Sequence, residues 1–145
     1  MTAGQGYEFV EGATSDLAFV ARGETLEGAF AAAAEALLAA TLDDPDSVED
    51  RERRRVAFEE PDLELLLLRF LNELVYLRDA EELLLHAGSL RVEGSDPARL
   101  DAELWGEPIQ PERHSMAAEV KAVTAHALRV RATPDGWEAS VTLDV

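Results

Sequence analysis

The stretch that decides the fold is DLELLLLRFLNELVYL, residues 62–77. Asp62 is a favourable N-cap residue, and Pro61 before it ends the preceding element. Apolar side chains then recur at helical spacing and form a very wide apolar face: Leu63, Leu66, Leu67, Phe70, Leu71, Leu74 and Leu77. We expect a helix here that forms the centre of the hydrophobic core.

A second helix is predicted closer to the N-terminus. Gly23 breaks the preceding pattern, and Thr25 is a suitable N-cap. Apolar or small residues follow at helical spacing: Leu26, Phe30, Ala33, Leu37 and Thr41. The helix should end before the acidic turn DDPD at residues 43–46.

Short β-prone stretches surround the two helices. The expected strands are residues 7–10, 17–22, 51–59, 83–92, 100–105, 120–132 and 137–145. The many charges in 51–59 indicate an edge strand, and the turn at 134–136 should join the last two strands into a hairpin. Because strands and helices do not alternate regularly, we expect one α+β domain over residues 1–145, with residues 1–6 flexible. It should be a sandwich of mostly antiparallel strands with two main helices.

Composition limits the function. Acidic residues outnumber basic ones by 30 to 13, a formal charge of −17, so tight direct RNA binding is not expected and a basic protein partner is favoured. The chain has no cysteine, which excludes thiolate catalysis and zinc–sulfur sites and is typical of a reducing cytoplasm. No stretch approaches the ~20 apolar residues of a membrane span, and the N-terminus lacks a signal peptide. We expect a cytoplasmic protein that is neither exported nor embedded.

The end of the sequence carries one candidate binding site. A terminal carboxylate on Val145, held beside the side chain of Asp144, would present several hard oxygens close together. Neighbouring carboxylates resist joint ionisation unless a cation lies between them, and such oxygens suit calcium, magnesium or manganese. The simpler interpretation of these residues is a solvated acidic end.

Other titratable residues have ordinary interpretations when they are taken singly. Asp16 is typical of a loop aspartate with a turn or capping role. Lys121 is typical of a strand lysine that is salt-bridged or extends to solvent. His86, His114 and His126 lie at no metal-binding spacing and are interpreted as surface or hydrogen-bonded histidines. We find no nucleophile motif or phosphate-binding glycine loop.

Motifs along nearly the whole chain resemble the archease family. In the C-terminal half they are PERH at 111–114, EVKAVTAH at 119–126, GW at 136–137 and VTLDV at 141–145. In the N-terminal half they are YEF at 7–9, TSD at 14–16, GETLEGAF at 23–30 and LNELVYL at 71–77. Three positions depart from the family pattern: Ala13 replaces a first-loop histidine, Ser15 an alanine, and Ala125 a tyrosine.

The resemblance implies a function. It implies that Asp16, Asp144 and the terminal Val145 jointly bind a metal ion, calcium in family members. It also implies a non-catalytic protein that assists an RtcB-type RNA ligase in tRNA splicing or RNA repair, promoting guanylylation of the ligase and repeated turnover. Lys121 matches a lysine implicated in that activation. The carboxylate of Asp16 is kept, whereas Ala13 cannot supply a role that depends on the first-loop histidine.

Two alternatives stay open. One is an independent metal-dependent hydrolase that uses Asp16, Asp144 and His126 around an ion with an open coordination position. The other is a general chaperone for RNA-modifying enzymes.

Overall fold

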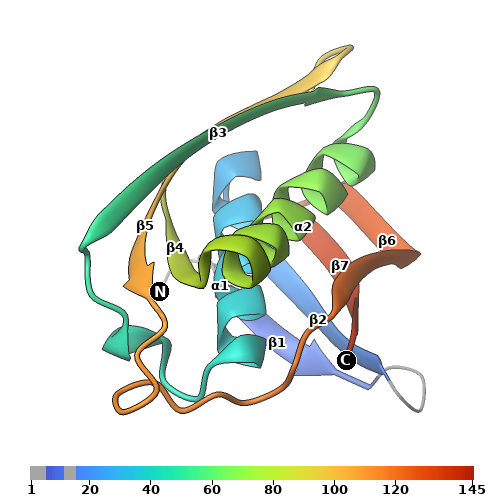
Figure 1. Cartoon of the computed structure of the whole chain (residues 1–145). Coiled ribbons are helices and arrows are strands. Elements are labelled where there is room, and N and C mark those ends of the chain that lie inside the picture. The colour runs from blue at the N-terminus through green and yellow to red at the C-terminus, as the bar shows by residue number, and fades with distance from the viewer. Residues whose placement is uncertain (1–5, 12–15) are drawn as a thin grey trace.

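The computed structural model describes residues 6–11 and 16–145 and has the predicted α+β fold. Its elements are β1 (Gly6–Val10), β2 (Asp16–Gly23), α1 (Leu26–Thr41), the 3₁₀ helix η1 (Pro45–Ser47), β3 (Glu52–Glu60), α2 (Leu63–Glu81), β4 (Leu83–Glu93), β5 (Ala98–Pro108), β6 (Ala122–Thr133) and β7 (Gly136–Asp144). The strands form two antiparallel sheets, in the orders β1-β2-β7-β6 and β3-β5-β4. The two helices lie between the sheets (Figure 1).

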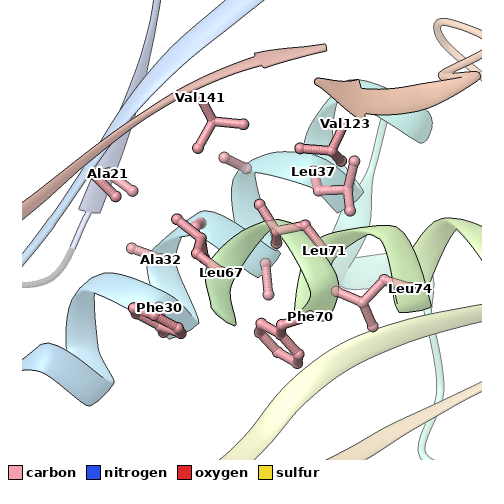
Figure 2. Close-up of a cluster of buried hydrophobic side chains, with 14 of the residues drawn as sticks. Ala21, Phe30, Ala32, Leu37, Leu67, Phe70, Leu71, Leu74, Val123 and Val141 are labelled. Atoms are coloured by element: carbon pink, nitrogen blue, oxygen red, sulfur yellow. The ribbon is translucent and has the colours of Figure 1, made fainter. Parts of the chain in front are cut away.

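Helix α2 forms the centre of the core, as its periodicity predicts. The carboxylate of Asp62 accepts a hydrogen bond from the Leu65 N–H at 2.8 Å and so caps the first turn. Four of its side chains are 0% exposed: Leu66, Leu67, Phe70 and Leu71. Figure 2 shows Leu67, Phe70 and Leu71 in the cluster of buried side chains. Complete burial of each is worth about 1.5–3 kcal/mol. The helix packs against β6 of one sheet and against β3, β4 and β5 of the other.

Helix α1 also packs in the core, but its buried residues are mostly alanine and not leucine. The Thr25 hydroxyl accepts a hydrogen bond from the Gly28 N–H at 3.0 Å, which confirms the predicted cap. Its buried face consists mostly of alanine, and the large buried members are Leu26, Phe30, Leu37 and Leu38. Alanine has the highest helix propensity and lets the helix approach its neighbours closely. Helix α1 thereby packs against both β2 and β4.

Element boundaries differ from the predicted ones by a few residues. Strand β6 begins at Ala122 and not at Val120, because the Val120 side chain is buried in the core and its carbonyl accepts a hydrogen bond from Arg78. Lys121 therefore precedes β6. Strand β6 also carries a bulge, since its register with β7 shifts between Thr124 and Arg129. The predicted β6–β7 hairpin is present, and β3 is an edge strand as expected.

Two expectations concern the ends and the membrane. The expected flexibility of residues 1–6 falls outside the described residues except at Gly6, which begins β1. Within residues 6–11 and 16–145, no helix is both long enough and apolar enough to cross a membrane.

Candidate functional site

Two aspartates from distant parts of the sequence face each other across one sheet. Asp16 begins β2, Asp144 ends β7, and the two residues are direct partners in the antiparallel register. Directly opposed residues lie on the same face of a sheet with Cβ atoms ~4.5–5.5 Å apart. Two carboxylates at this separation repel each other unless a cation or a proton intervenes.

The other two residues singled out in the sequence lie at the same corner. Val145 follows Asp144 directly and is 36% exposed. The Lys121 backbone N–H donates a hydrogen bond to the Asp144 carbonyl at 2.8 Å, and Ala122 pairs with Asp144 in the sheet. The end of the chain lies at the end of the four-stranded sheet (Figure 1). The fold thus brings Asp16, Lys121, Asp144 and Val145 together from three separate segments.

The donor atoms at this corner fit a hard divalent cation. They are the carboxylate oxygens of Asp16 and Asp144, and the α-carboxylate of a chain that ends at Val145. Calcium, magnesium and manganese prefer such oxygens. No group of three or more His, Cys, Asp or Glu side chains suited to a metal occurs within residues 6–11 and 16–145. Ala13, Thr14 and Ser15 of the first loop lie outside the described residues.

Lys121 is exposed and is the only lysine of the chain. Its side chain makes no ion pair with any residue that the structure describes, so the salt-bridged interpretation does not apply. Because the fold uses only the Lys121 backbone at this corner, the ammonium group is free to contact something outside the chain.

His126 does not join the two aspartates. It is exposed in the bulge of β6, next to Ala127, whose φ of 55° is left-handed. It lines a groove of 340 Å³ on the four-stranded sheet, together with residues that include Val10, Glu11, Ala18, Ser140 and Thr142. The residues that the hydrolase alternative needs, His126 with Asp16 and Asp144, are not grouped as metal ligands in the described structure.

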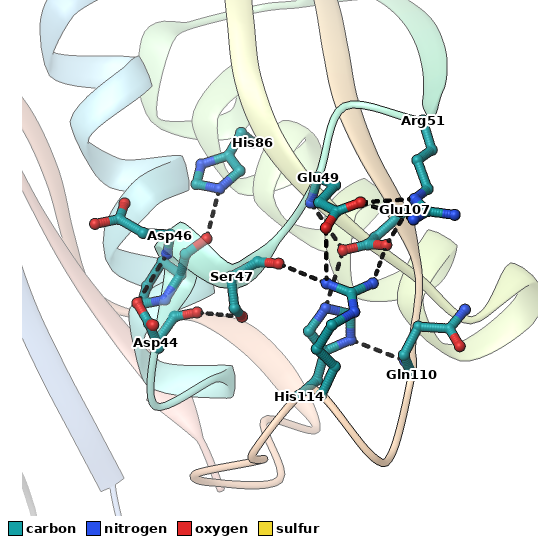
Figure 3. A network of polar contacts seen from close by, with 11 residues as sticks. Asp44, Asp46, Ser47, Glu49, Arg51, His86, Glu107, Gln110 and His114 are labelled. Atoms are coloured by element: carbon teal, nitrogen blue, oxygen red, sulfur yellow. Dashed lines mark hydrogen bonds and ion pairs between the residues drawn. The ribbon is translucent and has the colours of Figure 1, made fainter.

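A buried ion pair that no sequence pattern indicated joins α1 to β4. The ring of His86 contacts the Glu35 carboxylate through Nδ1 at 2.7 Å. Its Nε2 contacts the Pro45 carbonyl at 2.9 Å (Figure 3). Because both nitrogens face acceptors, both carry protons and the ring is an imidazolium. Burial acts to lower the pKa of His86, but the hydrogen bond and charge of Glu35 outweigh it, and the pKa is raised above its ordinary value. The ring also stacks on Trp105 at 4.4 Å.

A second buried network holds the segment that leads to Lys121. The Glu107 side chain is 0% exposed and accepts hydrogen bonds from Arg113, from His114 Nε2 at 3.1 Å and from the Glu49 N–H at 2.8 Å. Arg113 is the largest cause that lowers the pKa of Glu107 to about 2, against the opposing effect of burial. His114 Nδ1 accepts from the Gln110 N–H at 2.8 Å, so this ring is the neutral Nε2–H tautomer (Figure 3).

These networks confirm the hydrogen-bonded interpretation of His86 and His114. The exposure of His126 confirms its interpretation as a surface histidine. The sequence contained one signal for the second network, since Glu107 stands at the end of an alternating apolar strand with Arg113 and His114 soon after it. The pairing of His86 with Glu35 had no local signal.

Comparison with known proteins agrees with the motifs and the fold. The model of the archease protein family (MTH1598/TM1083) matches residues 7–145. The chain belongs to the archease family. The archease of Pyrococcus abyssi is 37% identical over 134 residues, which cover 91% of this chain and 94% of that protein. The archease of Thermococcus gammatolerans is 41% identical over the same shares of both chains.

Two solved structures of the family have this fold. The solution structure of protein 1598 of Methanobacterium thermoautotrophicum has a TM-score of 0.82 and 34% identity, covering 97% of this chain and 99% of that one. The crystal structure of a Thermotoga maritima archease has a TM-score of 0.65 over 94% of this chain and 95% of that one. At 18% identity it supports the fold alone, and that archease carries the description "possible chaperone".

Proposed function

We propose that this archease is a non-catalytic, metal-binding activator of an RtcB-type RNA ligase. It promotes guanylylation of the ligase and repeated turnover in tRNA splicing or RNA repair. The observation that carries the proposal is the corner at which Asp16 and Asp144 face each other and the Lys121 backbone is bonded to Asp144. The description of the Thermotoga maritima archease as a "possible chaperone" is in keeping with action on a partner protein.

In this proposal Asp16, Asp144 and the carboxylate of Val145 hold a divalent cation, preferably calcium, with magnesium and manganese as alternatives. The bound ion would neutralise the facing carboxylates and present a positive charge at the corner. Lys121 would contact the ligase or its bound nucleotide, since an exposed ammonium group is a natural partner for phosphate. The fold positions Lys121 through its backbone N–H and through the buried Glu107 network of the preceding segment.

The partner in this proposal is the ligase and not RNA itself. The formal charge of −17 disfavours tight binding to a phosphate backbone, but it favours a protein with a basic surface. The association with the ligase should weaken as salt rises, because exposed charges are screened beyond ~8 Å at physiological ionic strength. The compartment that we propose is the cytoplasm.

The decisive experiment measures ligase turnover under limiting ligase, with and without this protein. The proposal expects more than one product per ligase molecule only when both proteins and the cation are present. A single round in both reactions would overturn it. Hydrolysis of an RNA phosphate by this protein alone would support the hydrolase alternative. Equal stimulation of an unrelated RNA-modifying enzyme would support the general chaperone.

A further inference from the structure

Within residues 6–11 and 16–145 the sheets have four edge strands, and three of them are partly covered by a helix or carry many charges. An uncovered edge presents unpaired backbone N–H and C=O groups, which pair readily with another strand. The edges are β1 and β6 in one sheet and β3 and β4 in the other.

Helix α2 covers the edge of β6. The Asn72 side chain donates to the Val123 carbonyl at 3.0 Å and accepts from the Val123 N–H at 2.9 Å, as a neighbouring strand would. Glu64 accepts from the Val130 N–H at 2.9 Å. These contacts take up three of the backbone groups to which a foreign strand could bond.

Helix α1 covers β4 in the same way, and β3 is blocked by charge. Glu27 accepts from the Val92 N–H at 3.0 Å, and Glu35 accepts from the Ala87 N–H at 3.4 Å. Strand β3 carries ERRR at residues 52–55, where Arg54 bonds Glu81 at 2.9 Å. Adjacent charged side chains on an edge strand discourage pairing with another chain.

Strand β1 is less protected. Helix α1 lies beside it, and the one charged side chain of β1, Glu8, forms an ion pair with Arg22 of the neighbouring strand at 2.9 Å. All five residues of β1 are nevertheless exposed, and within the described part of the chain no helix side chain hydrogen-bonds to its backbone. Tyr7, Phe9 and Val10 are 40%, 40% and 41% exposed. Tyr7 packs edge-on against Phe9 with ring centroids 5.9 Å apart, and Phe9 packs edge-on against the buried Phe19 at 6.2 Å. Exposed aromatic residues beside an open edge mark an interaction surface.

We propose that β1 takes up an extended, basic segment of a partner protein as an additional strand of the four-stranded sheet. The backbone groups of β1 would supply the hydrogen bonds, and alternate side chains of the segment would face the two sides of the sheet. Apolar side chains cover Tyr7 and Phe9. Basic side chains on the other side meet Glu8, which is 58% exposed and would exchange its ion pair with Arg22 for one with the segment.

Charge selects this occupant over a second copy of the chain. Two copies each carry a formal charge of −17, so their acidic surfaces repel each other. A basic segment carries the opposite charge, so the negative field of this protein attracts it.

The position of β1 relates this surface to the proposed activation corner. Val10 pairs with Ala18, two residues from Asp16, so an added strand would run toward the Asp16–Asp144 pair. The inference rests on the proposed function only in requiring a protein partner.

The test uses the full chain, isotope-labelled, and a peptide of alternating lysine and valine. Two control peptides replace lysine by glutamate, or carry N-methyl groups on alternate amides, which removes the strand hydrogen bonds. We expect NMR shift changes and slower amide exchange in Gly6–Val10 with the first peptide only. Phe9→Lys should weaken peptide binding by about tenfold or more. Leu65→Lys, at an α2 residue that is also 40% exposed, should change it less than about twofold.

Three outcomes overturn the inference: equal binding of the N-methylated peptide, shift changes spread over the acidic surface with none centred on β1, or association of the protein with itself through β1. The comparison between the lysine–valine peptide and its N-methylated form uses the native protein. The test therefore does not depend on the folding of any variant. No ligase is present, so failure here leaves the proposed activation intact, and failure of ligase stimulation leaves this surface intact.

Discussion

Asp16 lies directly opposite Asp144 on the neighbouring antiparallel strand. A pair of like charges in this position destabilises a sheet by roughly 0.2–1 kcal/mol. A bound cation converts the same pair into a favourable contact, and the protein is then stabilised by an amount that grows with cation concentration. The metal-free and metal-loaded proteins should therefore respond in opposite ways to neutralisation of either carboxylate.

Neutralising either aspartate should weaken cation binding without unfolding the protein. We expect Asp16→Asn and Asp144→Asn each to lower calcium or manganese affinity by about tenfold or more, and to raise the melting temperature of the metal-free protein slightly. A short extension after Val145 should also lower affinity, because it replaces a terminal carboxylate with a neutral amide. Titration calorimetry and thermal melts measure both effects. Asp135→Asn, an exposed change in the β6–β7 turn, is the control. Equal affinity in all these proteins would rule out the site.

Replacing Lys121 should affect the partner and not the fold. The side chain is exposed and makes no ion pair with the described residues, so Lys121→Ala should change the melting temperature little. The same variant should reduce ligase stimulation, and Lys121→Arg should retain part of it. The matched control is Arg129→Ala, which removes another exposed cation of the same region. If Lys121→Ala instead melts early and keeps activity in proportion to its folded fraction, the lysine is structural.

The contact of His86 with Glu35 should make stability depend on pH near neutrality. The pKa of His86 is raised in the folded protein, so its contribution is fully present below the unfolded value of 6.5 and is lost as pH rises through the folded pKa. The charged groups that face it are Glu35 on α1 and Asp46 on η1. We expect the free energy of unfolding to fall over this window in the native protein.

The Glu35→Gln variant keeps the shape of this contact and removes its charge, so the fall should be smaller. Denaturant unfolding at a series of pH values measures the difference. Nitrogen NMR provides an independent control, because His86 should show two protonated ring nitrogens near neutral pH and His114 only Nε2–H. Identical pH dependence in the native and Glu35→Gln proteins would contradict an imidazolium at His86.

The Glu107 network should lose its contribution only in strong acid. Because the pKa of Glu107 is lowered from 4.5 to about 2, its stabilisation is present above the unfolded value and is lost as pH falls through that interval. Glu107→Gln leaves Arg113 and His114 with a weaker acceptor and should cost about 1–3 kcal/mol at neutral pH. Unfolding of the native and variant proteins at neutral and acidic pH gives the comparison. The cost should shrink toward pH 2, and a constant cost would show that the charge of Glu107 is not what stabilises the network.

Local patterns in the sequence were sufficient for the helices and most strands. Helix α2 was predicted from the period of its leucines and from Asp62, and helix α1 from Thr25 and the spacing that follows it. These features depend on neighbours within one or two turns, so a single stretch of chain contains the whole signal. The ends of the strands were predicted less well, because burial in the tertiary structure decides them. The Val120 side chain packs into the core, and β6 begins only at Ala122.

The tertiary structure alone decided which residues meet. Asp16 and Asp144 could be named from family motifs, but only strand order and register place them face to face. Likewise, composition showed a strongly acidic chain, but only the packing of α1 and α2 shows that helix side chains bond to the edges of β4 and β6 and, among the described residues, not to β1. His86 and Glu35 have no relation in the sequence, and their contact depends on how α1 lies against β4. The physical reason is that periodicity records local geometry and burial, whereas register and side-chain pairing arise from contacts between segments far apart in the chain.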